Sequence, residues 1–328
     1  MKAAVINQYG DENSFSLESN IPEPTPTKNQ VKIRVESAGI NPLDYRIRNG
    51  ELKVFLPSKF PMILGNDVAG IVTDIGRDVK NFKVGDHVFG MLDANESPSR
   101  RGFSKPGCYA EYAVTREDTL AIIPENIDFT QAAATPLAAL TAYQTLHQKT
   151  QLRTGDSLLI NGASGGVGTF AVQIAKAMGL KVTAVCSAKH SELLMSLGAD
   201  NCIDYKTIPL ENISERFDAV YDVVANQSYA KVKHLLNPGG CYLSNIATGS
   251  TIMSSVANKL FSPLGARQRN FHAWVMSNGD DLKRIAQMIA QQQITPIVSQ
   301  VIPLEDVSAA HKLIQSGHTT GKIVLSIE

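Results

Sequence analysis

The stretch "SLLINGASGGVGTFAVQIAKAMG" (157–179) decides the fold. It begins with an apolar run, passes through a tight glycine turn, and ends with apolar residues at helical spacing. Strand, glycine turn and helix in this order are typical of the start of a dinucleotide-binding unit.

The turn fits the pattern G-x-G-x-x-G, with Ala163 in the first glycine position. Gly165 would let the backbone approach a pyrophosphate, and Gly168 would let the helix pack closely on the strand. The N–H groups of Gly166 and Val167, together with the helix dipole, would hold the phosphate charge. The alternative is a glycine turn that serves packing alone.

The residues around this stretch alternate between strand and helix patterns. Strands are predicted over 157–161, 181–187, 201–205, 217–224 and 240–246, and helices over 166–178, 190–197 and 227–236. Continuous apolar strands that alternate with helices indicate a parallel sheet covered on both faces.

The N-terminal and C-terminal parts of the chain have sequence patterns that differ from this alternation of strands and helices. Residues 1–123 hold short, often alternating strands separated by Pro and Gly, which predicts a mostly antiparallel β domain. The tail adds a strand near 270–276, two helices near 280–292 and 305–316, and a last strand. We expect a β domain made of 1–123 plus 278–328, with the α/β domain inserted as 124–277.

Composition excludes several functional classes. The 328 residues have a formal net charge of zero, which gives no reason to expect a nucleic-acid partner. No segment reads as a signal peptide or approaches the length of a membrane span. The four cysteines are scattered, so a disulfide framework is not expected, and reduced thiols favour a cytoplasmic location.

The strand after the glycine turn predicts the cofactor. Enzymes that use NAD usually carry an acidic residue at its end, whereas Ser187 stands there, followed closely by Lys189. The sequence therefore predicts NADPH, with the 2′-phosphate near these two residues. Ser187 could also be a helix N-cap, and Lys189 a solvated lysine.

Several motifs together resemble the zinc-independent quinone oxidoreductase group of the medium-chain dehydrogenase/reductase superfamily. They are "AGINPLDYRIRNG" (38–50), "LGNDVAGIV" (64–72), "VGDHVFG" (84–90), "PLAALTAY" (136–143), "GASGGVG" (162–168), "LGADNCIDY" (197–205) and "TGKIVL" (320–325). The resemblance implies a Rossmann domain, a doubly wound parallel sheet, inserted in a GroES-like, mostly antiparallel β domain. We also expect a homodimer.

The resemblance also predicts that no metal is bound. Zinc alcohol dehydrogenases of this superfamily carry Cys at the position of Asn41 and His-Glu at the positions of Asn66 and Asp67, and their four-cysteine lobe is reduced here to Cys108. Asn is a poor zinc ligand beside Cys and His. Without a Lewis acid, the expected hydride acceptors are quinones and the C=C bonds of α,β-unsaturated carbonyls.

Two residues are predicted to be catalytic through the resemblance. Asn41 could hydrogen-bond a substrate oxygen or the carboxamide, and Tyr45 could donate a proton or hydrogen bond to an enolate. The alternatives are a turn at Asn41 and a half-buried aromatic at Tyr45, and nearby Asp44 could cap a helix.

Further cofactor contacts are implied by the same resemblance. Ser164 in the glycine turn and Tyr205 at the end of the third α/β strand would touch NADPH, as would Thr141 near the nicotinamide. Lys322 in "TGKIVL" is a weaker candidate. Tyr205 could also be only a tyrosine at a strand end.

Two other functions stay open from the sequence: an enoyl-thioester reductase, and an NADPH-binding sensor or structural protein without turnover. The segment 247–270 could form a wall of the substrate pocket, a dimer contact or a membrane-surface patch.

Overall fold

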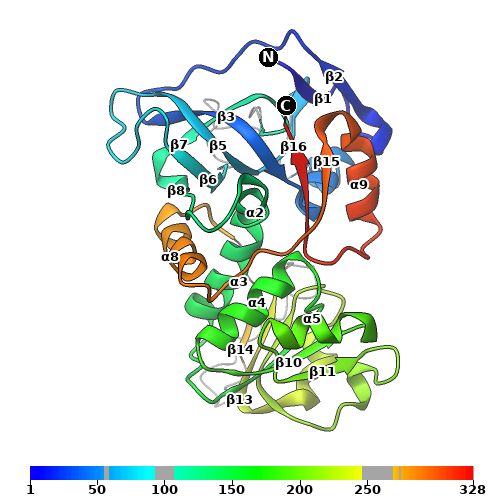
Figure 1. Cartoon of the computed structure of the whole chain (residues 1–328). Helices are drawn as coiled ribbons and strands as arrows, with labels where there is room; N and C mark the ends of the chain where they lie inside the picture. The colour runs from blue at the N-terminus through cyan, green and yellow to red at the C-terminus, as the bar shows by residue number, and fades with distance from the viewer. Residues whose placement is uncertain (55–58, 93–106, 246–268, 273–274, 328) are drawn as a thin grey trace. The chain divides into compact units, whose positions relative to one another are not determined.

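The computed structural model describes residues 1–54, 59–92, 107–245, 269–272 and 275–327. The chain divides into two compact units (Figure 1). The first holds residues 1–140, 276–292 and 296–328, and the second holds residues 141–275 and 293–295. No helix among the described residues is long and apolar enough to cross a membrane.

Among the described residues, the first unit contains a seven-stranded, mostly antiparallel sheet with the order β15-β16-β3-β5-β6-β8, and β7 also pairs with β3. These strands are β3 (Gln30–Gly39), β5 (Asp67–Ile75), β6 (His87–Met91), β7 (Tyr112–Arg116), β8 (Leu120–Ile122), β15 (Val298–Pro303) and β16 (Lys322–Ser326). A three-stranded sheet is formed by β1 (Ala3–Ile6), β2 (Phe15–Glu18) and β4 (Met62–Ile63).

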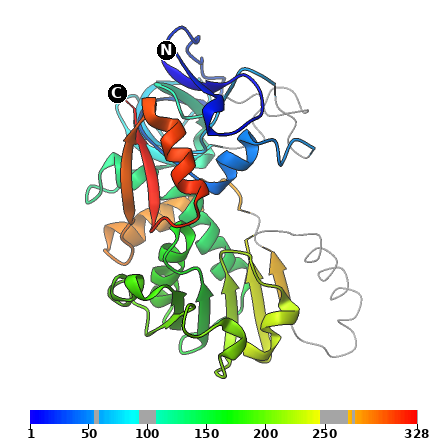
Figure 2. The ribbon, with the colours of Figure 1, turned by 90° about the vertical axis from the view of Figure 1, so that its right-hand side faces the viewer.

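The first unit also contains the helices α1 (Pro42–Arg48), α2 (Phe129–Ala133), α8 (Gly279–Ala290) and α9 (Val307–Gln315). Helix α9 packs on β15 and β16, as the orange-red ribbon shows (Figure 2). The C-terminal segment therefore completes the core that begins at the N-terminus, because Leu304, Ile323 and Leu325 are buried in one cluster with Val5 and Ile33.

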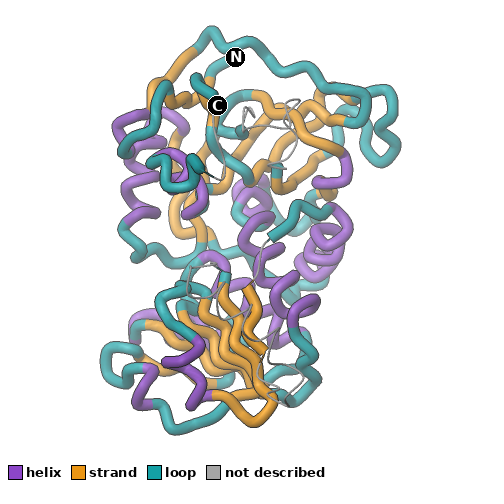
Figure 3. The backbone as a smooth tube through the Cα atoms, turned by 180° about the vertical axis from the view of Figure 1, so that it is seen from behind, coloured by secondary structure: helices purple, strands orange, loops and turns teal. Residues whose placement is uncertain are grey.

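The second unit contains a parallel sheet, visible in Figure 3 as neighbouring orange strands. Among the described residues its order is β11-β10-β9-β12-β13-β14, and every neighbouring pair is parallel. The strands are β9 (Ser157–Asn161), β10 (Lys181–Cys186), β11 (Asn201–Asp204), β12 (Phe217–Asp222), β13 (Leu236–Ser244) and β14 (Arg269–His272). The chain thus winds outward from β9 on one side and from β12 on the other, as in dinucleotide-binding doubly wound sheets. The predicted fold class is confirmed.

Three details differ from the sequence prediction. The helix predicted over 227–236 is shorter, because α6 covers only Tyr229–Val232. The strand predicted over 240–246 is β13, which already begins at Leu236, and the Pro-Gly-Gly segment at 238–240 forms a bulge inside it. The strand predicted over 270–276 is β14 (Arg269–His272), and most of the segment 247–270 lies outside the described residues.

The boundary between the units also lies elsewhere than predicted. Residues 124–140 were placed in the α/β domain, but they belong to the first unit because α2 packs on β3, β5 and β6 of the antiparallel sheet. The alanines of α2 suit this position, since Ala132 and Ala133 are fully buried.

Candidate functional site

The glycine turn joins β9 to α4 (Gly166–Ala177) in the second unit. Gly165 is the N-cap of α4 and has no side chain to bond the first N–H groups of the helix. These N–H groups, including those of Gly166 and Val167, have no partner inside the helix and carry the positive end of its dipole. The turn therefore offers donors to an anionic group.

The space around Gly168 and Gly165 shows which of the two glycines is required for packing. A Cβ added to Gly168 would lie 2.3 Å from the carbonyl oxygen of Gly162, so this glycine is required for the helix to approach the turn. A Cβ added to Gly165 would meet nothing closer than 3.6 Å. Packing within the protein therefore does not require glycine at position 165. A side chain there would instead occupy the space next to the N–H donors at the start of α4. The predicted contact of a pyrophosphate with this turn stays a prediction.

The strand ends next to the turn carry the residues predicted to select the cofactor. Ser187 follows β10, is 8% exposed, and its side chain makes no capping bond. Tyr205 follows β11, is 47% exposed, and its N–H donates to the carbonyl of Cys186 at 3.2 Å. The structure thus brings the backbones of 187 and 205 to neighbouring strand ends, with the exposed Lys189 just beyond Ser187. Their contact with NADPH stays a prediction.

A carboxylate that was not predicted from the sequence, that of Asp204, lies at the same end of the parallel sheet. Asp204 ends β11, and it lies in register with Cys186 of β10. Its Oδ1 accepts the N–H of Lys206 at 3.0 Å, so the carboxylate helps to close the turn after the strand. The Asp in "IDY" at the end of an apolar strand was the signal in the sequence.

Two other predicted cofactor residues of the second unit have defined places. Ser164 is half-buried in the glycine turn. Thr141 lies in α3 (Pro136–Lys149), is 6% exposed, and its carbonyl accepts the hydroxyl of Thr145 at 2.6 Å. Both roles stay predictions.

In the first unit, Asn41 lies in a buried polar cluster. It precedes α1 and is 2% exposed. Its Nδ2 donates to Oδ2 of Asp67 at 2.9 Å, and its Oδ1 accepts from the ammonium of Lys322. Both polar atoms of the amide therefore make a hydrogen bond within the protein, and Asn41 helps to hold this cluster. Its predicted contact with a substrate oxygen or the carboxamide stays a prediction.

Lys322 is the cation of the cluster. Its Nζ donates to the carbonyl of Ile40 at 2.9 Å and to Oδ2 of Asp67 at 3.2 Å, in addition to Oδ1 of Asn41. An ammonium has three N–H donors, and all three have acceptors here. Lys322 thus forms an ion pair with Asp67, which is 0% exposed. Its predicted contact with the cofactor stays a prediction.

Asp44 is a second buried carboxylate, within α1. Its Oδ2 accepts the backbone N–H of Asn41 at 2.7 Å and the hydroxyl of Tyr109 at 3.0 Å, and its Oδ1 accepts Nδ2 of Asn66 at 3.1 Å. It thus caps the start of α1, as the sequence allowed. Burial, and then the charge of Asp67, raise the pKa of Asp44 to about 7.

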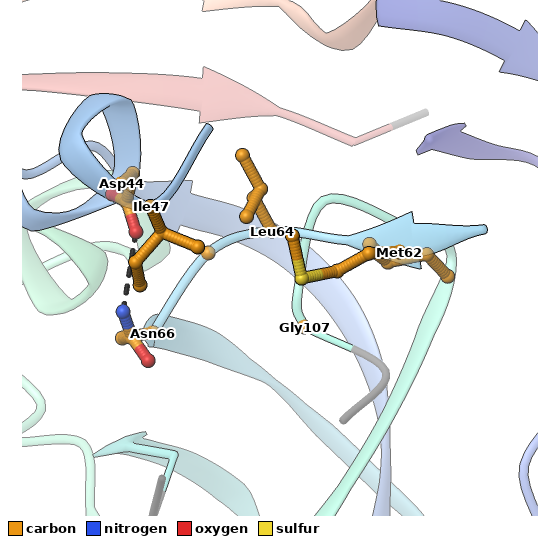
Figure 4. Close-up of a pocket in the computed structure, with 8 residues that line it drawn as sticks. Asp44, Ile47, Met62, Leu64, Asn66 and Gly107 are labelled. Atoms are coloured by element: carbon orange, nitrogen blue, oxygen red, sulfur yellow. Dashed lines mark hydrogen bonds between the residues drawn. The ribbon is translucent and has the colours of Figure 1, made fainter. Parts of the chain in front are cut away.

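A pocket opens beside Asp44 (Figure 4). The hydrogen bond from Asn66 to Asp44 lies at its polar side, and its remaining wall is apolar. The labelled lining residues are Asp44, Ile47, Met62, Leu64, Asn66 and Gly107. Tyr45, on the same helix α1, is half-buried, and its catalytic role stays a prediction.

The donor set of the first unit is a poor match for a metal. No group of three or more His, Cys, Asp or Glu side chains that could hold an ion is found in the described part of the chain. Cys108 is fully buried, and its Sγ donates to the carbonyl of Asp67 at 3.2 Å.

Comparison with known proteins adds to this geometry. The family model "Alcohol dehydrogenase GroES-like domain" matches residues 27–125, and the model "Zinc-binding dehydrogenase" matches residues 197–325. The NADPH-dependent alkenal/one oxidoreductase of Arabidopsis thaliana is 35% identical over 99% of this chain and 79% of its own length. The 2-methylene-furan-3-one reductase of Solanum lycopersicum is 34% identical over the same shares. The structure of a quinone oxidoreductase from Coxiella burnetii has a TM-score of 0.86 and 32% identity, and the match covers 100% of this chain and 99% of that one.

Proposed function

Since this chain belongs to the quinone oxidoreductase group of the medium-chain dehydrogenase/reductase superfamily, we propose that it transfers a hydride from NADPH to quinones or to the C=C bond of α,β-unsaturated carbonyls. It is an oxidoreductase enzyme. The observation that carries this proposal is the glycine turn at the N-terminus of α4, where a Cβ on Gly165 would meet nothing closer than 3.6 Å, beside the central strands β9 and β12 of the doubly wound sheet.

NADPH is the cofactor, and the residues present fit it. Backbone N–H groups at Gly166 and Val167 would hold the pyrophosphate, and Ser187, Lys189 and Tyr205 stand where the 2′-phosphate would be expected. When bound, the reduced nicotinamide supplies the hydride. The protein would supply the orientation of the reacting groups.

The same residues support a reaction without zinc. Asn41 and Asn66 replace the Cys and His of the zinc alcohol dehydrogenases, and the amide oxygen of Asn41 is occupied by the Lys322 ammonium. A metal ion beside that ammonium would be repelled. Conjugated acceptors then suit the enzyme best, because delocalisation stabilises the charge that develops on hydride transfer.

Turnover tests the proposed function. Oxidation of NADPH is measured with a quinone, an enal, an enoyl thioester and acetone, and zinc is measured by elemental analysis of protein purified without added metal. We expect the quinone or the enal to react fastest, far less than one zinc per chain, and activity that survives a chelator.

Each alternative has a distinct outcome in that experiment. The enoyl thioester reacting fastest would favour a thioester reductase, and NADPH binding with no turnover would favour a sensor or structural protein. Acetone reacting fastest, or one tightly bound zinc per chain, would contradict the proposed mechanism.

The preference for NADPH is expected to depend on Ser187. A charge-assisted contact to the 2′-phosphate contributes about 1.5–3 kcal/mol, so the wild type should prefer NADPH over NADH by roughly tenfold to a hundredfold. Ser187→Asp should reverse much of this preference, because a carboxylate repels the phosphate and accepts from the ribose hydroxyl. Fluorescence titration with both cofactors measures the ratio.

Ser196→Asp is the matched control, since it adds the same charge at an exposed position of α5 (Ser191–Ser196). It should leave the ratio unchanged. Equal affinities for the two cofactors in the wild type would contradict the assignment of this strand end. A homodimer and a cytoplasmic location stay predictions from the sequence.

A further inference from the structure

The carboxylate of Asp222, at the end of β12, accepts four hydrogen bonds. Asp222 is fully buried. Its Oδ1 accepts from Nδ2 of Asn161 at 2.8 Å and from the N–H of Ala225 at 3.1 Å. Its Oδ2 accepts from the N–H of Gln227 and from the hydroxyl of Tyr242, both at 2.9 Å. Burial and the Asp222 charge raise the pKa of Tyr242, so this phenol keeps the proton that it donates.

These bonds constrain the loop 223–227. Two of the four donors are backbone N–H groups of the loop itself, those of Ala225 and Gln227. Ala225 has a φ of 59°, in the left-handed region that residues with a side chain rarely adopt. The carboxylate therefore holds a loop conformation that the chain alone does not favour.

The loop lies directly against the glycine turn. An ideal Cβ on Gly162 would lie 2.3 Å from Cγ2 of Val224, and the N–H of Val223 donates to the carbonyl of Asn161 at 3.1 Å. Val224 is nevertheless 50% exposed, which is high for a valine so close to the sheet. Its free surface is thus presented next to the turn.

This place in the sheet is the topological switch point. Strands β9 and β12 are neighbours, with Asn161 in register with Asp222, and the chain continues from them to opposite sides of the sheet. Dinucleotides bind outside the carboxyl ends of the strands at such a point. The loop that follows β12 is therefore placed to form one wall of that crevice.

We propose that Asp222 is a positioning residue for the cofactor: it holds the loop 223–227 so that Val224 forms an apolar wall against the uncharged part of NADPH, beside the glycine turn. This inference rests on the proposed function, because it requires NADPH in that crevice. Asp222 itself is buried and acts only through the loop.

The opposite end of the same strand provides a matched control. Asp218 accepts the N–H and the hydroxyl of Ser157, both at 2.8 Å, and Nδ2 of Asn237 at 2.8 Å. Asp218 accepts three donors and is partly buried, whereas Asp222 accepts four and is fully buried, and Asp218 lies at the amino end of β12, away from the crevice. If Asp222 acted on stability alone, replacing either carboxylate would lower Tm and leave the affinity for NADPH unchanged.

The experiment compares Asp222→Asn with Asp218→Asn in the full chain. NADPH affinity is measured by fluorescence titration without an acceptor, and Tm is measured without cofactor. We expect Asp222→Asn to raise the Kd for NADPH about tenfold and Asp218→Asn to change it less than twofold, although both lower Tm. Adding Ala225→Gly to Asp222→Asn should recover part of the affinity, because glycine adopts positive φ without strain.

A second variant covers the case in which Asp222→Asn does not fold. Val224→Ser changes an exposed side chain, so Tm should stay the same while the Kd for NADPH rises severalfold. An unchanged Kd in Val224→Ser, or equal changes of Kd in Asp222→Asn and Asp218→Asn, would overturn the inference while leaving the proposed function intact. A wild-type protein that does not bind NADPH would overturn the proposed function, and this inference with it.

Discussion

Replacing Lys322 with methionine is expected to lower the free energy of unfolding by about 3–5 kcal/mol, because Asp67 would stay buried without its cation. The two side chains are 4% and 0% exposed, so water cannot take the place of the ammonium. The substitution also removes a donor from the carbonyl of Ile40 and from the amide oxygen of Asn41. Urea unfolding at pH 7, followed by circular dichroism, measures the loss.

Lys176→Met is the control for this prediction. Lys176 pairs with Asp200 at 2.6 Å, but the two side chains are 48% and 44% exposed. Exposed pairs contribute about 0–1 kcal/mol, so this variant should be nearly as stable as the wild type. Similar small losses in both variants would show that water reaches Asp67 and that the cluster is not the dry ion pair described here.

The second large effect is a pH dependence of stability that comes from Asp44. Burial first, and then the charge of Asp67, raise its pKa from 3.8 to about 7 in the folded protein. The folded state therefore binds the proton more tightly than the unfolded state, and between pH 3.8 and about 7 it holds more protons. The contribution of Asp44 to stability is therefore expected to fall as the pH rises through this window, by a total on the order of 4 kcal/mol.

Asp44→Asn isolates this contribution, because asparagine does not titrate. Unfolding free energies of wild type and variant are measured in urea at several pH values from 4 to 8. The wild-type value minus the variant value should decrease across this range and level off above pH 7. A difference that stays constant, or that increases with pH, would mean that water or a rearranged neighbour solvates the carboxylate.

The dinucleotide-binding domain was predictable because its signals are local. The strand 157–161 was predicted with the bounds of β9 (Ser157–Asn161), and the helix after the turn was predicted within a residue of α4 (Gly166–Ala177). Apolar continuity, glycine spacing and helical periodicity all operate over fewer than about twenty residues, so the sequence shows them directly.

The glycine-rich bulge in β13 shows where local signals mislead. The strand was predicted to begin only at Gly240, yet pairing with β12 already includes Leu236, on the other side of Pro238 and Gly239. A strand can absorb extra residues as a bulge when a neighbouring strand holds its two parts in place. The local sequence around residues 238–240 does not show that β12 is this neighbouring strand, so the bulge could not be predicted from it.

The roles of single polar residues depended on the tertiary structure. Asn41 and Lys322 bond one another and Asp67, although 281 residues separate Asn41 from Lys322. Neither contact was predicted from the sequence. Arg48 and His311 are likewise brought together inside the first unit, where the guanidinium lies 3.1 Å from Nδ1 of the imidazole. No periodicity or spacing links such positions.

By itself, then, the sequence determined the order of the strands and helices, the glycine turn and the family, because each of these depends on neighbouring residues or on motifs in order. Only the tertiary structure decided which polar groups are buried and which are bonded to one another. The physical reason is that desolvation and hydrogen bonding depend on everything that surrounds a group in space. Asp222 shows this most clearly, since an ordinary Asp at a strand end becomes a fully buried carboxylate with four donors only when β9, β13 and the loop 223–227 close around it.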